Sequence, residues 1–397
     1  MEGMENLAVL EPVAEPASAG EDSPTPRRRW PLGPLLRKLG RSIASGSDWL
    51  FGLAVLVVGL SVLAALPVVQ FLSLGYFLES SARVARTGRL RDGLIGVRRA
   101  ARTGGIVLGC LISLLPLWLA SSYAESADLI DPGGTVAQRG RVVLAIVTAL
   151  TFIQITTACA RGGRLRHFLW PFGIPFWLVR KIRAGGLYTE SRDGFWEFVA
   201  AFRLPSYFRL GLVGFLGTLA WIVVPASLIA ASGRFPVLGF LGAFLLAIVA
   251  PSLPFLQVRH AVEGRTSALF SLRSVRERFR RAPWALAFAL MVLLVAAVPL
   301  YLLKIEMIPR EAAWLPSVVF VIFLAPAHLL VGWAYARSWR RYRPRHWTVR
   351  ALGRIAIIPV ALFYVLVVVL AQYTSWGGIW SLYEQHAFLL PVPFLNM

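Results

Sequence analysis

Long uncharged stretches dominate the pattern of polar and apolar positions along the chain. They are Trp49–Leu78, Gly104–Tyr123, Val142–Ala160, Leu210–Ala231, Val237–Leu256, Trp284–Leu303, Trp314–Ala336 and Ile355–Thr374. All but the first have 19–23 residues, and a helix needs ~20 residues to cross ~30 Å of hydrocarbon. Within lipid, backbone N–H and C=O groups must find partners inside their own segment. The pattern therefore predicts an all-α fold, a polytopic transmembrane helical bundle with eight apolar segments.

The first apolar segment is longer than the others. It has 30 residues, contains Pro67, and has basic clusters at both ends. Proline removes a backbone donor and bends or breaks a helix. The interpretation we favour is a proline-broken, re-entrant hairpin beside seven spans, with Gln70 and Ser73 satisfying the broken turn. The alternative is one long tilted helix that crosses the membrane.

The basic residues predict the orientation of the chain. The formal net charge is +21, and 36 of the 41 Lys and Arg residues lie at 27–41, 83–102, 161–209, 259–281 and 337–354. The remaining connections are short and near neutral or acidic. Because positive loops stay in the cytoplasm, we expect a multi-pass cell-membrane protein with its basic loops cytoplasmic.

Composition divides the chain into three parts. Residues 1–46 are acidic at first and then basic, and predict a disordered cytoplasmic N-terminal segment. No cleavable signal peptide is visible there. Residues 47–374 are predicted to form the transmembrane bundle. Residues 375–397 are predicted to be a short aromatic extracytoplasmic tail, because Trp376 and Trp380 suit a membrane interface.

Three stretches are amphipathic or aromatic but do not span. Residues 187–203 and 268–281 place apolar side chains at near-helical spacing, and residues 168–179 are aromatic and interrupted by prolines. Segments of this kind lie in the headgroup plane. They are interpreted either as ordinary flanks of membrane helices or as lipid-sensing elements.

Anionic lipid headgroups are the predicted partners of the basic clusters. Every cluster adjoins a span, and an arginine near an anionic surface contributes ~1 kcal/mol. The candidate headgroup contacts are Arg98, Arg99, Arg276, Arg278, Arg280, Arg281, Arg340 and Arg341. Nucleic acid also attracts positive charge, but the position of the clusters beside membrane spans disfavours it.

The sequence shows no signature of catalysis. It has no HExxH, GxSxG, P-loop or CxxC pattern. Cys110 and Cys159 fall in predicted spans, where they suit packing as small hydrophobes. Carboxylates that converge could bind a hard cation through their oxygen atoms. The groups expected on the outer side are Glu125, Asp128, Asp131, Glu306, Glu311, Glu384 and His386. We therefore expect no catalytic, metal or cofactor-binding residue and no enzyme activity.

Polar groups inside the spans are few. His328 is the only histidine within them, and a lone histidine there is usually just hydrogen-bonded. Gly105 and Gly109 form a GxxxG pattern, and glycines recur every three residues from Gly211 to Gly217. Such glycines allow close helix packing, within the chain or in a homo-oligomer or a complex with a protein partner.

Two stretches repeat the same order of features. Gly75–Gly109 begins Gly-Tyr-Phe-Leu, continues into an Arg-rich helix and re-enters the membrane; Ala268–Leu303 is a basic amphipathic helix followed by a span. This order resembles an uncharacterised family of bacterial polytopic integral membrane proteins, a domain of unknown function. The resemblance covers about residues 50–300. It implies the bacterial cytoplasmic membrane and carries over no activity and no site residue.

Three functions fit the sequence. The favoured one is a non-enzymatic membrane scaffold or assembly factor that contacts anionic lipid, because polar groups in the spans are sparse and basic flanks are abundant. The alternative is a permease for an apolar or lipid-like solute, since proline-kinked helices can enclose a cavity. A membrane enzyme would require the outer carboxylates to converge.

Overall fold

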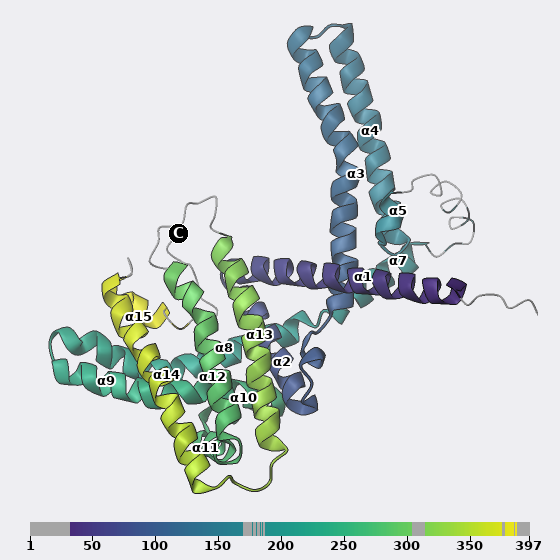
Figure 1. The fold of residues 1–397 in the computed structure, drawn as a ribbon. Helices are drawn as coiled ribbons and strands as arrows, with labels where there is room; N and C mark the ends of the chain where they lie inside the picture. The colour runs from purple at the N-terminus through teal and green to yellow at the C-terminus, as the bar shows by residue number, and fades with distance from the viewer. Residues whose placement is uncertain are drawn as a thin grey trace, which may run out of the picture. The chain divides into compact units, whose positions relative to one another are not determined.

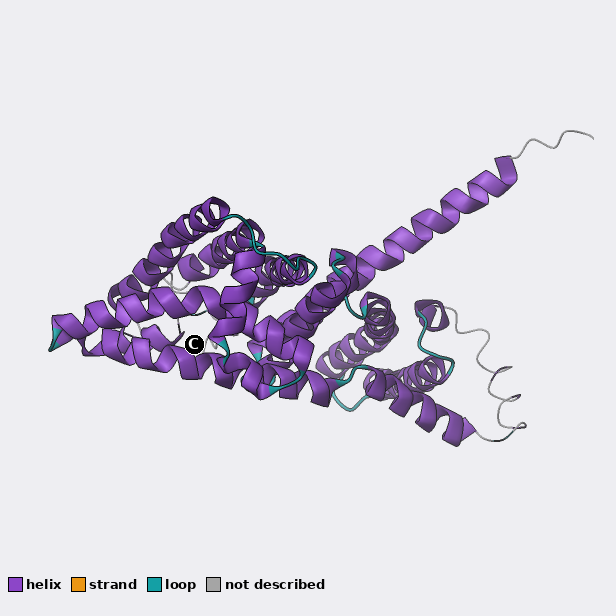
Figure 2. Cartoon of the chain, turned by 90° about the horizontal axis from the view of Figure 1, so that it is seen from below, coloured by secondary structure: helices purple, strands orange, loops and turns teal. Residues whose placement is uncertain are grey.

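The computed structural model describes residues 32–169, 187–303, 314–374 and 378–384, with a few single residues outside these ranges. In this part of the chain every regular element is a helix, and Figure 2 shows helices joined by loops without a strand. The predicted all-α class is confirmed.

The helices follow the predicted apolar segments closely (Figure 1). They are α1 (Leu32–Ala65), α2 (Gln70–Thr87), α3 (Val97–Ile130), α4 (Thr135–Ala160), α5 (Leu165–Leu169), α7 (Leu187–Ala201), α8 (Leu204–Ala230), α9 (Pro236–Val249), α10 (Leu253–Glu263), α11 (Leu272–Arg281), α12 (Pro283–Leu303), α13 (Leu315–Trp339), α14 (Trp347–Thr374) and α15 (Ser381–Glu384). Short 3-10 turns join several of them.

Eight stretches among the described residues are long and apolar enough to cross a membrane, and each overlaps one predicted segment. They are Ser45–Ala65, Val97–Ile130, Thr135–Ala160, Arg192–Gly233, Pro236–Glu263, Pro283–Leu303, Leu315–Trp339 and Trp347–Thr374. Their outer faces carry large apolar side chains; Trp118 and Phe152 are 66% and 69% exposed. Apolar surface of this extent suits lipid rather than water. The chain is a multi-pass helical membrane protein.

The chain divides into two units, Met1–Gly46 and Ser47–Met397. Within the first unit the structure describes only the beginning of α1, so the prediction for residues 1–31 lies outside the described residues. The structure differs from the predicted disorder at residues 32–46, which are helical. Pro34 lies in the first helical turn, where a missing N–H leaves no hydrogen bond unmade.

The first apolar segment is broken at its proline, as predicted. Between α1 and α2 the chain makes a turn that contains Pro67 and Val68, and Val68 has a φ of +67°. The first N–H groups of α2 donate to carbonyls of the turn, Gln70 to Leu66 at 3.0 Å and Leu72 to Val69 at 2.9 Å. The Ser73 hydroxyl donates to the Gln70 carbonyl at 2.7 Å within the first turn of α2. The segment is thus two helices and not one continuous helix. Whether both enter from the same side of the membrane stays a prediction.

Helix α2 lies in the centre of the larger unit, between α8 and α13. On the α8 side, a Cβ added at Gly75 would lie 1.8 Å from the Tyr207 carbonyl oxygen, and one at Gly211 would lie 1.9 Å from the Phe71 carbonyl oxygen. The predicted role of the glycine stripe in close helix packing is therefore confirmed within the chain. On the α13 side, the Ser81 hydroxyl donates to the backbone carbonyl of His328 in α13 at 2.8 Å.

Helices α3 and α4 form an antiparallel pair (Figure 1). The turn between them contains Asp131 and Gly133, within an Asp-Pro-Gly-Gly sequence, and Gly133 has a φ of +77°. The GxxxG pattern of α3 also packs inside the chain, because a Cβ at Gly109 would lie 2.4 Å from the Phe168 ring of α5. Intrachain contacts thus account for this pattern without a second copy.

Two of the three predicted amphipathic stretches are helices. They correspond to α7 and to α11, which follows a 3-10 turn at Thr266–Phe270. On α11, Val275 is buried while Arg276 and Arg280 are exposed, so the helix has an apolar and a basic face. Most of the third stretch, residues 168–179, lies outside the described residues.

Candidate functional site

The eight arginines predicted to contact headgroups lie at three places in the fold. Arg98 and Arg99 begin α3; Arg276, Arg278, Arg280 and Arg281 are on α11; Arg340 and Arg341 follow the end of α13. The structure does not gather all of them at one site.

Three of these arginines contact the protein itself. The Arg278 guanidinium lies 4.5 Å from the Tyr335 ring centroid and 5.0 Å from that of Trp339, which places it between two aromatic rings of α13. Arg340 donates through Nη2 to the carbonyl of Thr87 at the end of α2. Arg99 donates to the backbone carbonyl of Ala201, the last residue of α7, at 2.5 Å. These contacts hold the basic helices against the bundle.

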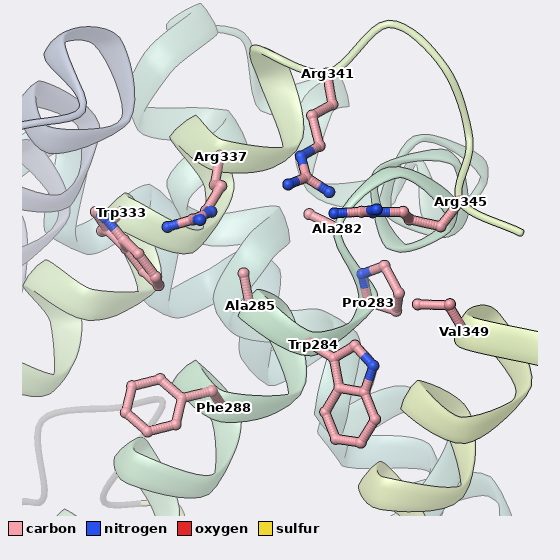
Figure 3. A pocket seen from close by; sticks show the side chains of 10 residues that line it. All are labelled: Ala282, Pro283, Trp284, Ala285, Phe288, Trp333, Arg337, Arg341, Arg345 and Val349. Atoms are coloured by element: carbon pink, nitrogen blue, oxygen red, sulfur yellow. The ribbon is translucent and has the colours of Figure 1, made fainter.

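Arg341 belongs to a pocket of about 340 Å³ between α12, α13 and α14. Its lining residues are Ala282, Pro283, Trp284, Ala285, Phe288, Trp333, Arg337, Arg341, Arg345 and Val349. Figure 3 shows the guanidinium groups of Arg341 and Arg345 close together beside Ala282, with Arg337 next to Trp333 and with Trp284 and Phe288 on the opposite side. We call this the arginine–tryptophan pocket.

Helix geometry and one backbone bond build the arginine–tryptophan pocket. Trp333 and Arg337 are four residues apart on α13, so they lie on one face of this helix, and Arg341 follows shortly after the helix ends at Trp339. The Arg337 guanidinium lies 5.1 Å from the Trp333 ring centroid, a cation–π contact that orients it. The Arg345 N–H donates to the Arg280 carbonyl at 2.9 Å, which ties the loop after α13 to the end of α11.

The described part of the chain supplies no acidic partner for the three arginines of this pocket. Among the described residues, none of Arg337, Arg341 and Arg345 forms an ion pair. Burial, together with the like charges of Arg345 and Arg337, lowers the pKa of Arg341 below its ordinary value. Converging cations without counter-charges favour an anion, and the planar guanidinium fork matches the oxygens of phosphate.

A second pocket, of about 230 Å³, adjoins the first on the α2 side. It is lined by Gly88, Trp333, Ala336, Arg337, Arg340 and Arg341. Gly88 follows the last residue of α2 with a φ of +73°, and a Cβ there would lie 2.4 Å from Nη2 of Arg340. Only glycine fits at this position without displacing the guanidinium.

An apolar groove of about 310 Å³ lies elsewhere, between α1, α2, α3 and α8. Its walls include Leu56 and Leu60 of α1 and Leu72 of α2, and its few polar groups come from Tyr76, Arg99 and neighbouring residues. The Tyr76 hydroxyl donates to the backbone carbonyl of Ile95, in the loop before α3, at 3.0 Å. The groove is therefore suited to hydrocarbon rather than to a polar solute.

The described residues do not form a candidate metal or catalytic cluster. No group of three or more His, Cys, Asp or Glu side chains there could hold a metal ion. Glu306 and Glu311 lie outside the described residues, so convergence of all the outer carboxylates is not tested. His386 instead pairs with the Tyr364 hydroxyl at 2.5 Å. His328 is buried with its ring stacked on Phe77 at 5.5 Å between centroids.

Two residues of the arginine–tryptophan pocket, Arg337 and Arg345, were not among the predicted contacts. They lie in the predicted basic cluster at 337–354; the four-residue spacing from Trp333 is a signal for Arg337, and the sequence offers none for Arg345 beyond its place in that cluster. No family model, curated protein or solved structure matches this chain. Its function must therefore be inferred from the residues themselves.

Proposed function

We propose that this membrane protein is a non-enzymatic scaffold or assembly factor that binds anionic phospholipid, with the headgroup in the arginine–tryptophan pocket. The observation that supports the proposal is the convergence of Arg337, Arg341 and Arg345, which have no acidic partner within the described ranges. The pocket lies where the candidate span Leu315–Trp339 ends, which is the depth of a headgroup.

The other wall of the pocket suits the acyl part of a lipid. Trp284 and Phe288 are about half exposed, at 52% and 47%, on the first two turns of α12. Tryptophan is favoured at the membrane interface, where one side of the ring meets headgroups and the other hydrocarbon. A phosphate against the arginines and acyl chains along Trp284 and Phe288 would satisfy both walls at once.

The expected preference for anionic lipid follows from the number of arginines. At ~1 kcal/mol for each arginine near the headgroups, three arginines contribute roughly 3 kcal/mol, which corresponds to about 100-fold in affinity. We expect phosphatidylglycerol to bind about 100-fold more tightly than zwitterionic phosphatidylcholine with the same acyl chains.

Native mass spectrometry of the full chain, titrated with each lipid in detergent micelles, tests this. The triple variant R337Q/R341Q/R345Q should lose most of the preference for phosphatidylglycerol. The matched control R265Q/R273Q/R343Q removes three exposed charges that lie outside both arginine-lined pockets and were not predicted headgroup contacts, and it should change the affinity less than threefold. Equal losses in both variants would mean diffuse charge attraction and would contradict a defined site. Absence of lipid binding by the wild-type protein would reject the proposal.

The second candidate function is a permease for an apolar or lipid-like solute, and the apolar groove between α1, α2, α3 and α8 favours it. Gly59 lines this groove, whereas Ala54 on the same helix does not. In vesicles containing a fluorescent short-chain lipid, the wild-type protein should accelerate movement between leaflets. G59L should abolish the acceleration by filling the groove, and A54L should not. Movement no faster than in protein-free vesicles would exclude this function for that lipid.

A further inference from the structure

The two arginine-lined pockets are adjacent and share a wall. Trp333, Arg337 and Arg341 line both of them, whereas Arg345 lines only the larger and Arg340 only the smaller. Each pocket thus has one arginine of its own and two in common. Arg337 lies in the last turn of α13, and Arg341 follows Arg340, the residue that caps this helix.

The smaller pocket is held in shape by the end of α2. Arg340 donates to the carbonyl of Thr87, and its guanidinium packs over Gly88, where a Cβ would lie 2.4 Å away. A guanidinium group has five N–H donors, so the bond to Thr87 leaves most of them for a ligand. The position of Arg340 is therefore fixed before any ligand arrives, and no acidic side chain among the described residues pairs with it.

Two phosphate groups fit this arrangement better than one. A single phosphate placed between Arg341 and Arg345 leaves Arg340 without an anion, and four guanidinium groups repel one another until their charge is neutralised. Two phosphates on separate lipids would each need acyl space, but the apolar side chains Trp284 and Phe288 line only the larger pocket. One lipid with two phosphates neutralises both pockets and extends its chains from one of them.

We infer that the ligand of this site is a single lipid with two phosphate groups, one held by Arg341 and Arg345 and the other by Arg337 and Arg340, with Trp333 between them. This inference rests on the proposed function, because it specifies the lipid class bound at the same site. The site distinguishes such a lipid from one-phosphate lipids by the distance between its two halves rather than by charge alone.

Native mass spectrometry of the full chain in detergent micelles tests the inference. The probes are diphosphatidylglycerol and phosphatidylglycerol with the same acyl chains, compared at equal phosphate concentration. One molecule of diphosphatidylglycerol should bind at least tenfold more tightly than phosphatidylglycerol and should displace it. R340Q and R345Q should each lower the affinity for diphosphatidylglycerol about fivefold, while R343Q, an exposed arginine of the same loop outside both pockets, should leave it unchanged.

Three outcomes would overturn the inference. Equal affinity of the two lipids per phosphate, or insensitivity to R340Q, would show that only the larger pocket binds lipid, and the proposed function would stand. Binding of inorganic diphosphate as tight as that of diphosphatidylglycerol would show that a soluble ligand is held and that the lipid chains are irrelevant. Failure of both lipids to bind would reject the inference and the proposed function together.

Discussion

Replacing Gly332 by alanine tests whether α2 is as tightly held as the structure shows. Gly332 lies on α13 against Ser81 of α2, where an added Cβ would be 2.3 Å from the Ser81 carbonyl oxygen and 2.9 Å from its Cα. Both are backbone atoms, so neither can rotate away. Ordinary contact begins near 3.4 Å, and the two helices would therefore have to separate by about 1 Å.

The cost of G332A follows from three contributions. Overpacking of this kind costs about 1–3 kcal/mol. Separation of the helices also weakens the bond from the Ser81 hydroxyl to the His328 carbonyl, and interhelical hydrogen bonds in membranes contribute about 0.6 kcal/mol on average. Alanine recovers about 0.5–1 kcal/mol, because glycine is the poorer helix former. The expected net loss of unfolding free energy is about 2 kcal/mol.

Titration of the protein in mixed micelles with SDS, followed by the fluorescence of its 14 tryptophans, measures this loss. The control is G59A on α1, because no atom lies within 4 Å of a Cβ added there. G59A should leave the unfolding free energy unchanged or raise it slightly. If G332A and G59A unfold at the same SDS fraction, α2 and α13 do not approach as closely as described, and the reasoning is refuted.

Three further predictions concern the break before α2, its contact with α8 and the topology. V68G should raise the unfolding free energy by about 1 kcal/mol, because a β-branched residue at positive φ is strained, and an unchanged midpoint in the SDS titration would contradict this. In the same titration G75A should lower the unfolding free energy more than G332A does, because the added Cβ would lie 1.8 Å from the Tyr207 carbonyl oxygen. In a cysteine-free background, G133C and P344C should react with an impermeant thiol reagent from opposite sides of the membrane. Labelling of both cysteines from the same side would reject the predicted order of spans.

The sequence was sufficient to predict the spans and the breaks between them, because each depends on local chemistry. An uncharged stretch of about 20 residues has few alternatives to a membrane helix. Pro67 and the Asp131 turn end their helices through the backbone limits of proline and glycine, which act whatever surrounds them. Helix α1 is the exception, since it continues through residues predicted to be disordered and begins at Leu32.

The candidate site could be predicted only in part, because a pocket depends on contacts between helices that are distant in sequence. Arg341 was expected to meet headgroups, but its partners Arg337 and Arg345 become relevant only when α12 places Trp284 opposite them. Arg278 is a second example. Its place in a basic run predicted contact with a lipid headgroup, which stays a prediction, but nothing in the sequence indicated that its guanidinium lies over the rings of Tyr335 and Trp339.

The hydrogen bonds of α2 bear on the choice between scaffold and permease. This helix carries more polar side chains than a lipid-facing span usually does, and transport sites in membranes are commonly built from such groups. Here, however, Ser73 donates to Gln70 within the helix, and Ser81 donates to the carbonyls of Phe77 and His328. Hydroxyls that are satisfied by neighbouring backbone do not need a solute. The hydroxyls of Ser73 and Ser81 are thus explained by packing, whereas the proposed lipid site rests on arginines for which the described residues supply no acidic partner.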